Sequence, residues 1–431
     1  MGVPATILLL ATILRLWGLG SPPNLYWDEQ YYVFDASVYL GGGIGQPIPG
    51  APDAKIADEG TWVHPPMGKW MIALLGVGPI GLRSIGWRMP SALFGVAGVA
   101  VLYLLAFRLW RSVWWAGLAA LLLALDGLHI VQSRAAMLDI FLTTFITAGL
   151  LFLVLDRERI DSDVVGRWPR VERVFGSPYR LWAGMMLGSA VATKWAGLFA
   201  LTFGAILCSA WMLSANRRSE RPTSAGVGTL IAAFAIVPLL VYLLSYGTFF
   251  YQHGIAGHDF LTLQWRMLEY HLHHIQANPE NSSPWTWPLL IHPIQYFAST
   301  KGATTSRIVA LGNPALWWGF LALVPWGLMS LVRHRTWRDA VCVGGFAATF
   351  IPWLFISRTQ FFFYMTPAVP FMCLCVPSWL RSLPNRSRHP AGIAVAAAVL
   401  VIGIAFTPIW TAWRFPVPWR EALRWLPTWR I

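Results

Sequence analysis

The sequence predicts an all-α, polytopic membrane protein with about eleven membrane-spanning helices. Of its 431 residues, 56% are hydrophobic and only 12% are charged, and the mean hydropathy is +0.53. A soluble domain has about 25% charged residues and could not keep so much apolar surface from water. The apolar residues form runs long enough to cross a bilayer, and Arg residues gather in the gaps between those runs. This pattern argues against nucleic acid as the reason for the net charge of +13.

The candidate spans are the apolar runs of about 15–22 residues. They lie near residues 3–20, 89–107, 113–127, 136–155, 180–191, 195–214, 224–246, 314–332, 339–356, 361–380 and 390–409. The first run lacks a basic region before it, so we expect a retained span and not a signal peptide. The stretch 67–82 contains Lys69 and several Gly, and it is expected to be an interfacial or partly inserted helix.

Arg residues predict the orientation of the spans. They cluster in the gaps 156–180, 215–223, 333–338 and 381–389, and at the turn between Arg108 and Arg111. Basic loops stay in the cytoplasm, which places the N-terminus there too. The loops 21–87 and 247–313 then lie outside, with outer turns near 128–135, 192–194 and 357–360. Residues 1–431 are expected to form a single transmembrane domain, because no soluble domain or internal repeat is visible.

Nine ionisable residues fall in the outer loops or at the outer ends of spans. They are Asp28, Glu29, His64, Lys69, Arg88, Arg134, Asp139, Lys194 and Arg358. Ionisable groups at membrane depth cost about 2.5–3.5 kcal/mol each, so they usually face a cavity and have a function. Arg and Lys can neutralise a lipid phosphate, and an Asp can accept the proton of an attacking hydroxyl. The set therefore predicts an outward-facing site for group transfer from a lipid phosphate to a hydroxyl.

Simpler explanations exist for each of these signals alone. An Asp-Glu pair at a helix start often has a capping role, and an Arg at a span end often reaches toward headgroups. Lys194 is the stronger signal because it interrupts the apolar run AVATKWAGLFAL. His271, His273 and His274 resemble a metal cluster, but an interfacial helix is the favoured explanation and no metal is expected.

Six segments carry a resemblance to a known family. They are WDEQYYVFDASVY in the first outer loop, HPPMGKW at 64–70, WRMPSALFGV at 87–96, LDGLHIVQSRAAMLDIFL at 125–142, SAVATKWAGLFAL at 189–201 and SSPWTWPLL at 282–290. In this order they resemble the protein O-mannosyltransferases. The resemblance implies a GT-C glycosyltransferase fold and an inverting transfer of mannose from polyprenyl-phosphate mannose to Ser or Thr of secreted proteins.

The resemblance also implies roles for the candidate residues. Asp28 is expected to act as the base or to orient the acceptor, and Glu29 to bind the acceptor or to support the loop; the division of labour stays open. Arg88 and Lys194 match positions near the donor phosphate. Five further residues have expected roles. Arg134, in the QSR…LD segment, is expected near the phosphate, and Arg358 is placed there from topology alone. Asp139 of the same segment, His64 and Lys69 are expected to have supporting roles.

One departure from the family narrows these expectations. Eukaryotic members carry a soluble β-trefoil domain in the loop that corresponds to 247–313, and that loop is too short for one here. The chain resembles the compact bacterial members, and among them the actinobacterial ones. The expected setting is the plasma membrane, with a secreted acceptor protein, proximity to the secretion translocon, no cofactor and no nucleic acid.

Two alternatives are left open. A sister GT-C transferase acting on a lipid or a cell-wall glycan would share the acidic loop and the basic cavity, although HPPMGKW favours the protein enzyme. A transporter or flippase is the second alternative. Transporters often show internal repeats and acidic residues in mid-span, and neither feature is visible here.

Overall fold

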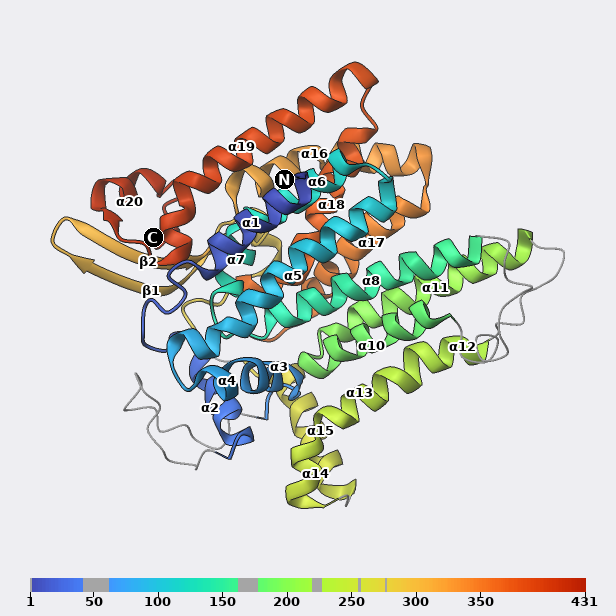
Figure 1. The fold of residues 1–431 in the computed structure, drawn as a ribbon, viewed down its shortest axis with the longest axis horizontal. Helices are drawn as coiled ribbons and strands as arrows, with labels where there is room; N and C mark the ends of the chain where they lie inside the picture. The colour runs from blue at the N-terminus through green and yellow to red at the C-terminus, as the bar shows by residue number, and fades with distance from the viewer. Residues whose placement is uncertain (1, 42–61, 162–176, 219–226, 255–256, 276) are drawn as a thin grey trace.

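The chain folds into an elongated bundle of helices with a small cap of irregular structure at one end (Figure 1). The computed structural model describes residues 2–41, 62–161, 177–218, 227–254, 257–275 and 277–431. The helices of the bundle lie side by side along the long axis. The loops and short helices before α5 gather toward the end where α8 begins. The sheet and the C-terminus lie toward the same end.

Helices occur in every predicted span. The long elements are α1 (Val3–Leu16), α5 (Ser84–Trp110), α6 (Val113–Ala124), α8 (Asp139–Asp161), α10 (Pro178–Thr193), α11 (Gly197–Arg218), α12 (Val227–Ile231), α13 (Val237–Ser245), α16 (Pro314–His334), α17 (Trp337–Phe350), α18 (Val369–Arg381) and α19 (Asn385–Thr411). A π-helical turn, η3 (Ala232–Ile236), joins α12 to α13.

Length and hydropathy support a multi-pass membrane protein but not the predicted number of spans. Among the described residues, seven helices are long and apolar enough to cross a membrane, or eight if the bent pair α6–α7 is one span. Helices α1, α10 and α17 have 14, 16 and 14 residues, which is short for a span. The figure of about eleven therefore stays a prediction.

The core of the bundle lies around α8 and α18. The most apolar window of α8 is 83% buried, and that of the segment Phe362–Arg381 is 94% buried. The corresponding windows of α12–α13 and α16 are only 22% buried. Helix α8 packs against α5, α10 and α11. Side chains at the start of α8 are thus enclosed by protein.

The span that contains α6 is broken inside the protein. Helix α6 ends at Ala124, and α7 (Gly127–Ser133) follows at an angle of 64°. The break frees backbone carbonyls, which must find donors where water is excluded. Arg15 donates to the carbonyls of Leu123 and Ala124 at 3.3 and 3.2 Å, and Asn313 Nδ2 donates to that of Leu125 at 3.2 Å.

Helix α7 corrects one expectation about the loops. An outer turn was expected near 128–135, but most of that stretch is a buried helix. Asp126 caps the start of α7, because its Oδ1 accepts a hydrogen bond from the backbone N–H of His129 at 2.9 Å. Its Oδ2 accepts a second hydrogen bond, from Trp317 Nε1 at 2.6 Å.

Shorter elements cover the end of the bundle where α8 begins. The helical ones are α2 (Glu29–Tyr39), α3 (Met67–Ile72), η1 (Ala73–Val77), α4 (Gly78–Ile80), α14 (Gly247–His253), α15 (Gly257–His273), η4 (Pro284–Thr286), η5 (Ile351–Phe355), η6 (Phe362–Ala368) and α20 (Val417–Leu423). Helix α15 contains His271 and His273, so the helix expected at these residues is present.

A three-stranded antiparallel sheet adds β structure to the predicted all-α fold. Strand β1 (Ile294–Lys301) pairs with β2 (Thr304–Ala310), which also pairs with β3 (Phe415–Pro416) near the C-terminus. The hairpin turns at Gly302, whose φ of 57° is the left-handed conformation that glycine adopts easily. Strand β1 brings Tyr296 toward the bundle.

Candidate functional site

Three of the predicted residues come together where α8 and α10 meet the loop that joins α1 to α2. Lys194 Nζ lies 2.7 Å from Asp139 Oδ2, and both side chains are buried. Lys194 follows the last residue of α10 in an extended conformation, and Asp139 opens α8. The Lys194 ammonium also lies 5.5 and 5.6 Å from the ring centres of Phe363 and Tyr364. The pair is a buried charge centre with aromatic walls.

Asp28 belongs to this centre and does not act as a helix cap. It holds the N-cap position of α2, but its side chain makes no capping hydrogen bond. The carboxylate instead accepts a hydrogen bond from the Tyr32 side chain, and it is close enough to Lys194 and Asp139 to feel both charges. Burial raises the pKa of Asp28 to about 6; Lys194 and Tyr32 lower this pKa, and Asp139 raises it.

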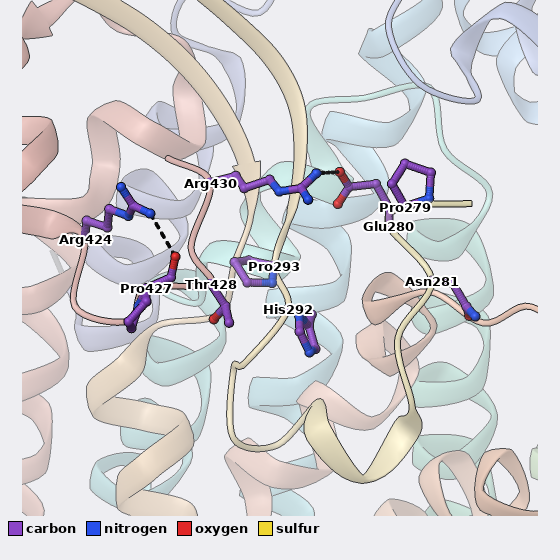
Figure 2. A pocket seen from close by; sticks show the side chains of 9 residues that line it. All are labelled: Pro279, Glu280, Asn281, His292, Pro293, Arg424, Pro427, Thr428 and Arg430. Carbon is purple, nitrogen blue, oxygen red and sulfur yellow. Dashed lines mark hydrogen bonds and ion pairs between the residues drawn. The ribbon is translucent and has the colours of Figure 1, made fainter. Parts of the chain in front are cut away.

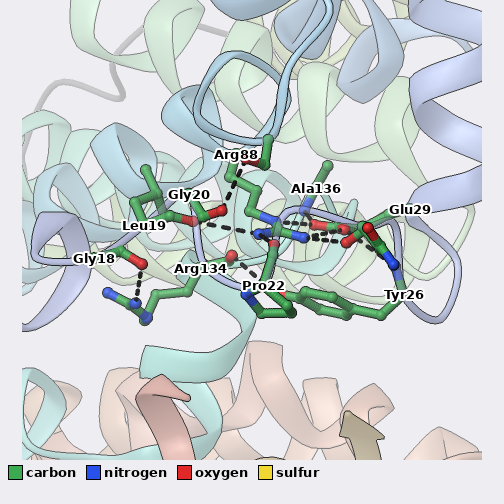
Figure 3. A network of polar contacts seen from close by, with 11 residues as sticks. Gly18, Leu19, Gly20, Pro22, Tyr26, Glu29, Arg88, Arg134 and Ala136 are labelled. Carbon is green, nitrogen blue, oxygen red and sulfur yellow. Dashed lines mark hydrogen bonds and ion pairs between the residues drawn. The ribbon is translucent and has the colours of Figure 1, made fainter. Parts of the chain in front are cut away.

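Both carboxylate oxygens of Glu29, the neighbour of Asp28, accept hydrogen bonds from other protein groups (Figure 3). Its carboxylate forms a two-point ion pair with Arg88, with Nε–Oε1 and Nη2–Oε2 distances of 2.8 Å. Oε1 also accepts the backbone N–H of Ala136 at 2.9 Å, just before α8. Both charged side chains are completely buried. Glu29 therefore ties the first loop to α5 and to the chain that leads into α8.

Arg88 and Arg134 also direct their guanidinium groups at protein atoms. Besides Glu29, Arg88 donates to the carbonyls of Leu19, Pro22 and Asn24, at 3.3, 2.6 and 2.8 Å. Arg134 donates to five carbonyls, four of them at the end of α1 and just beyond it. They are those of Leu14, Arg15, Trp17 and Gly18, at 2.9–3.2 Å, and that of Thr411, at 3.3 Å.

The supporting residues of the HPPMGKW segment hold α2 and α15 in place. Lys69 Nζ lies 2.8 Å from Asp35 Oδ2, in a buried pair between α3 and α2. The His64 ring stacks on that of His271, with centroids 5.4 Å apart, and His271 Nε2 lies 3.0 Å from the Val63 carbonyl oxygen. Burial and nearby cations lower the pKa of His64 well below its usual value and that of His271 to about 3, so both rings are neutral.

Arg358 differs from the other predicted cations. Its guanidinium lies 5.2 and 5.8 Å from the ring centres of Tyr364 and Trp353, and among the described residues no carboxylate forms an ion pair with it. Tyr364 is the same ring that the Lys194 ammonium contacts. Arg358 is thus half-buried beside the Lys194–Asp139 pair, and no carboxylate in the described part of the chain neutralises its charge.

Sequence reasoning missed several residues of this site: Tyr32, Asp35, Gln132, Tyr296 and Tyr364. Tyr32 and Asp35 lie four and seven residues after Asp28, so they share a face of α2, and this spacing was a usable signal. Gln132 and Tyr296 join through tertiary contacts only, with Gln132 Nε2 2.8 Å from the Tyr296 hydroxyl. Nothing in their local sequence indicates that contact.

A separate pocket opens between the 279–293 segment and the C-terminal tail (Figure 2). Its volume is about 310 Å³, and its lining includes His292, Arg424 and three prolines. Arg430 pairs with Glu280 at 3.2 Å across its rim, and Arg424 donates to the Pro427 carbonyl at 2.9 Å. None of the predicted site residues lines this pocket.

Solved structures show which fold this arrangement belongs to. The chain superposes on the Saccharomyces cerevisiae protein O-mannosyltransferase Pmt1-Pmt2 complex bound to the sugar donor with a TM-score of 0.81, at 14% identity, over 100% of this chain and 92% of that one. ArnT from Cupriavidus metallidurans bound to undecaprenyl phosphate gives a TM-score of 0.61 at 17% identity, over 93% and 69%. These likenesses confirm the predicted GT-C fold.

Sequence comparisons agree. The chain is 29% identical to the polyprenol-phosphate-mannose–protein mannosyltransferase of Corynebacterium glutamicum, over 99% of this chain and 93% of the relative. It is 28% identical to that of Mycobacterium tuberculosis, over 99% and 91%. Residues 5–256 match the model of the dolichyl-phosphate-mannose-protein mannosyltransferases, and residues 257–429 match that of the C-terminal four-span region of protein O-mannosyltransferase. The chain therefore belongs to the dolichyl-phosphate-mannose-protein mannosyltransferase family.

Proposed function

We propose that the protein is an inverting glycosyltransferase that moves mannose from polyprenyl-phosphate mannose to Ser or Thr hydroxyls of secreted proteins. The observation that carries this proposal is the Asp28 carboxylate, which is not used as a helix cap and lies beside the buried Lys194–Asp139 pair. Family membership and the names of the bacterial relatives support the same donor and acceptor.

In the proposed reaction Asp28 takes the proton of the acceptor hydroxyl as its oxygen attacks the anomeric carbon of mannose. The bond between that carbon and the phosphate oxygen breaks, and the configuration at the carbon inverts. The polyprenyl phosphate leaves with the bonding electrons and gains one negative charge. Lys194 and Arg358 are the cations that we assign to this charge. Among the described residues the Lys194 ammonium donates only to Asp139, so two of its three donors remain, and Arg358 has no ion-pair partner there.

We propose positioning roles for Arg88, Glu29 and Arg134. The sequence placed Arg88 and Arg134 at the phosphate, but their guanidinium groups already donate to protein oxygens. Breaking such a buried pair to reach a phosphate would leave Glu29 charged and unpaired, which costs about 3–5 kcal/mol. Glu29 and Arg88 instead hold the loop that presents Asp28. Lys69 and His64 brace the same loop from α3 and α15.

The proposed setting follows the distribution of Arg. The N-terminus lies in the cytoplasm and the site faces outward across the plasma membrane, where a secreted protein would pass in an extended form close to the translocon. The structure is consistent with this arrangement because α2, α15 and the hairpin gather at the end of the bundle where α8 begins, away from the Arg-rich end of α8 (Figure 1).

Transfer of radiolabelled mannose tests the proposal. Membranes containing the protein would be mixed with labelled polyprenyl-phosphate mannose and a Ser/Thr/Pro-rich peptide. The wild type should label the peptide, and Asp28→Asn, which inserts normally, should lose most of that activity. Asp259→Asn, a matched change at an exposed position of α15, should retain it. Label in a lipid or glycan only would support the sister transferase, and near wild-type transfer by Asp28→Asn would exclude the base role.

A further inference from the structure

Two buried polar groups beside Asp28 lack hydrogen-bond partners among the described residues, and a third is only partly satisfied. The Gln132 side-chain oxygen and the Trp27 indole nitrogen are buried, and among the described residues neither has a hydrogen-bond partner. The Tyr296 hydroxyl accepts a hydrogen bond from Gln132 at 2.8 Å, and no acceptor for its own proton is found in the described part of the chain. Buried polar groups are almost always paired, so two unpaired groups beside a third with an unused donor require an explanation.

The three groups form one continuous cluster. Tyr296 stacks on Trp27, with ring centroids 5.2 Å apart and an angle of 15° between the planes. Trp27 in turn meets the edges of Phe361 and Phe363. Turning the Gln132 amide over would exchange its nitrogen and oxygen, but one of the two would still face Tyr296 and the other would still lack a partner. In that orientation the Tyr296 hydroxyl would donate to the amide oxygen, and the unpaired groups would be the Gln132 and Trp27 nitrogens. Either assignment leaves at least two buried polar groups without a partner among the described residues.

The cluster lies at the reaction centre. Trp27 directly precedes Asp28, and Gln132 lies on α7, two residues before Arg134. Asp139 and Asp28 both lie near enough to Tyr296 to act on its hydroxyl. Burial and these two carboxylates raise the pKa of Tyr296 well above its usual value, so the hydroxyl keeps its proton and can donate it.

We infer that Gln132, Tyr296 and Trp27 form the subsite for the hydroxyl groups of the transferred sugar. The inference rests on the proposed function. A sugar hydroxyl both donates and accepts hydrogen bonds, which suits a set of two donors and one amide oxygen with no net charge. A phosphate would need cations, and within the described ranges this cluster holds none. Aromatic rings around the set exclude water and strengthen each hydrogen bond.

Donors that lack one hydroxyl test the assignment. Transfer would be measured with polyprenyl-phosphate mannose and with its 2-, 3-, 4- and 6-deoxy forms, for the wild type, Gln132→Met and Tyr296→Phe. Each variant should lower kcat/KM for the mannose donor about three- to tenfold, the value of one hydrogen bond. One deoxy donor should have a lower kcat/KM than the mannose donor in the wild type. In the variant, kcat/KM should be equal for these two donors. The KM for the acceptor peptide should stay unchanged.

Matched variants control for general disturbance. Gln295→Met changes the neighbouring residue of β1, whose amide oxygen accepts from Arg307 at 3.1 Å, and Tyr103→Phe changes a tyrosine on α5. Both should keep wild-type discrimination among the donors. Tyr296→Phe retains the ring that stacks on Trp27, so it remains a valid test even if Gln132→Met folds poorly.

The outcomes separate this inference from the proposed function. If wild-type protein transfers mannose but both variants keep the full penalty for every deoxy donor, the three groups do not bind the sugar and the inference is wrong. A rise in the acceptor KM alone would assign the cluster to the peptide and would also overturn it. If the wild type transfers no mannose, thermal unfolding in detergent decides. A larger rise in Tm with polyprenyl-phosphate mannose than with polyprenyl phosphate, lost in the variants, would support the subsite without the transferase activity. Equal rises with the two lipids would overturn it.

Discussion

Asp28 shows how burial converts a capping position into a candidate base. A side chain at an N-cap usually accepts a backbone N–H of its own helix, which fixes it at low cost. Asp28 turns instead toward Tyr32 and the Lys194–Asp139 pair. Its pKa of about 6 is above the usual value of 3.8 because burial disfavours the charge. At neutral pH most of the carboxylate is still ionised and can accept a proton.

The pKa of Asp28 predicts the pH dependence of transfer. The base form exists above its folded pKa, so kcat/KM should fall as the pH drops below about 6. Tyr32 lowers this pKa, so Tyr32→Phe should move the acid limb to higher pH. The profile of kcat/KM against pH, measured for both proteins, checks this; an unmoved limb in Tyr32→Phe would contradict the hydrogen bond.

The raised pKa of Asp28 also means that the folded state binds more protons than the unfolded state between pH 4 and 6. The contribution of Asp28 to the free energy of unfolding therefore falls as the pH rises through that window.

The break between α6 and α7 shows how an element can be bent within the protein interior. The carbonyls that the break releases are met by Arg15 and Asn313, and Asp126 begins the new helix. Asn313 also donates to the Val399 carbonyl at 3.0 Å, and its Oδ1 accepts the backbone N–H of Ala315 at the start of α16. One side chain thus joins α6, α16 and α19.

Loss of Asn313 should therefore destabilise the bundle. Asn313→Ala leaves two buried carbonyls without this donor and removes a helix cap, with an expected cost of about 2–4 kcal/mol. Thermal unfolding in detergent should show a clear fall in Tm. Asn385→Ala is the matched control, since Asn385 is exposed at the first turn of α19. Equal Tm values for the two variants would show that the break does not depend on Asn313.

The elements also show which parts of the fold a sequence reveals. Apolar runs predicted a helix in each span, because lipid and core both require internally bonded helices with apolar side chains. Helix α7 was missed since its residues are buried on all sides and its direction is set by Asp126 and Arg15. The hairpin was missed although β-branched residues lie on both sides of Gly302, because the stretch 247–313 was expected to be a loop.

At the scale of the whole molecule, the sequence predicted which charges share one end but not how they pair. Three buried ion pairs each join residues that are 34 to 59 positions apart in the sequence. They are Lys69 with Asp35, Arg88 with Glu29, and Lys194 with Asp139. Such pairing depends on tertiary packing, which spacing along one helix cannot indicate. Without it, every cation looked equally available to a phosphate. Arg358 has no ion-pair partner among the described residues and Lys194 donates only to Asp139 there, so these two cations are the stronger candidates.

Thiol labelling tests the orientation of the molecule. All four native cysteines are buried, so they should give little background with a membrane-impermeant thiol reagent. Ala298→Cys in β1 is exposed at the proposed outer end, and Ser387→Cys is exposed at the start of α19 near the proposed cytoplasmic end. In intact cells the first should be labelled and the second only after permeabilisation. The reverse pattern would show that the site faces the cytoplasm.

The backbone conformation of Trp27 limits which residues this position can accept during evolution. Its φ of 53° is a left-handed conformation, which costs a bulky residue about 1–2 kcal/mol. Stacking on Tyr296 and edge contacts with Phe361 and Phe363 offset that cost and fix the residue that precedes Asp28. A glycine there would relax the backbone but release Asp28. Selection for stability alone would favour that replacement, and selection for catalysis would oppose it, so this position records a trade-off between the two.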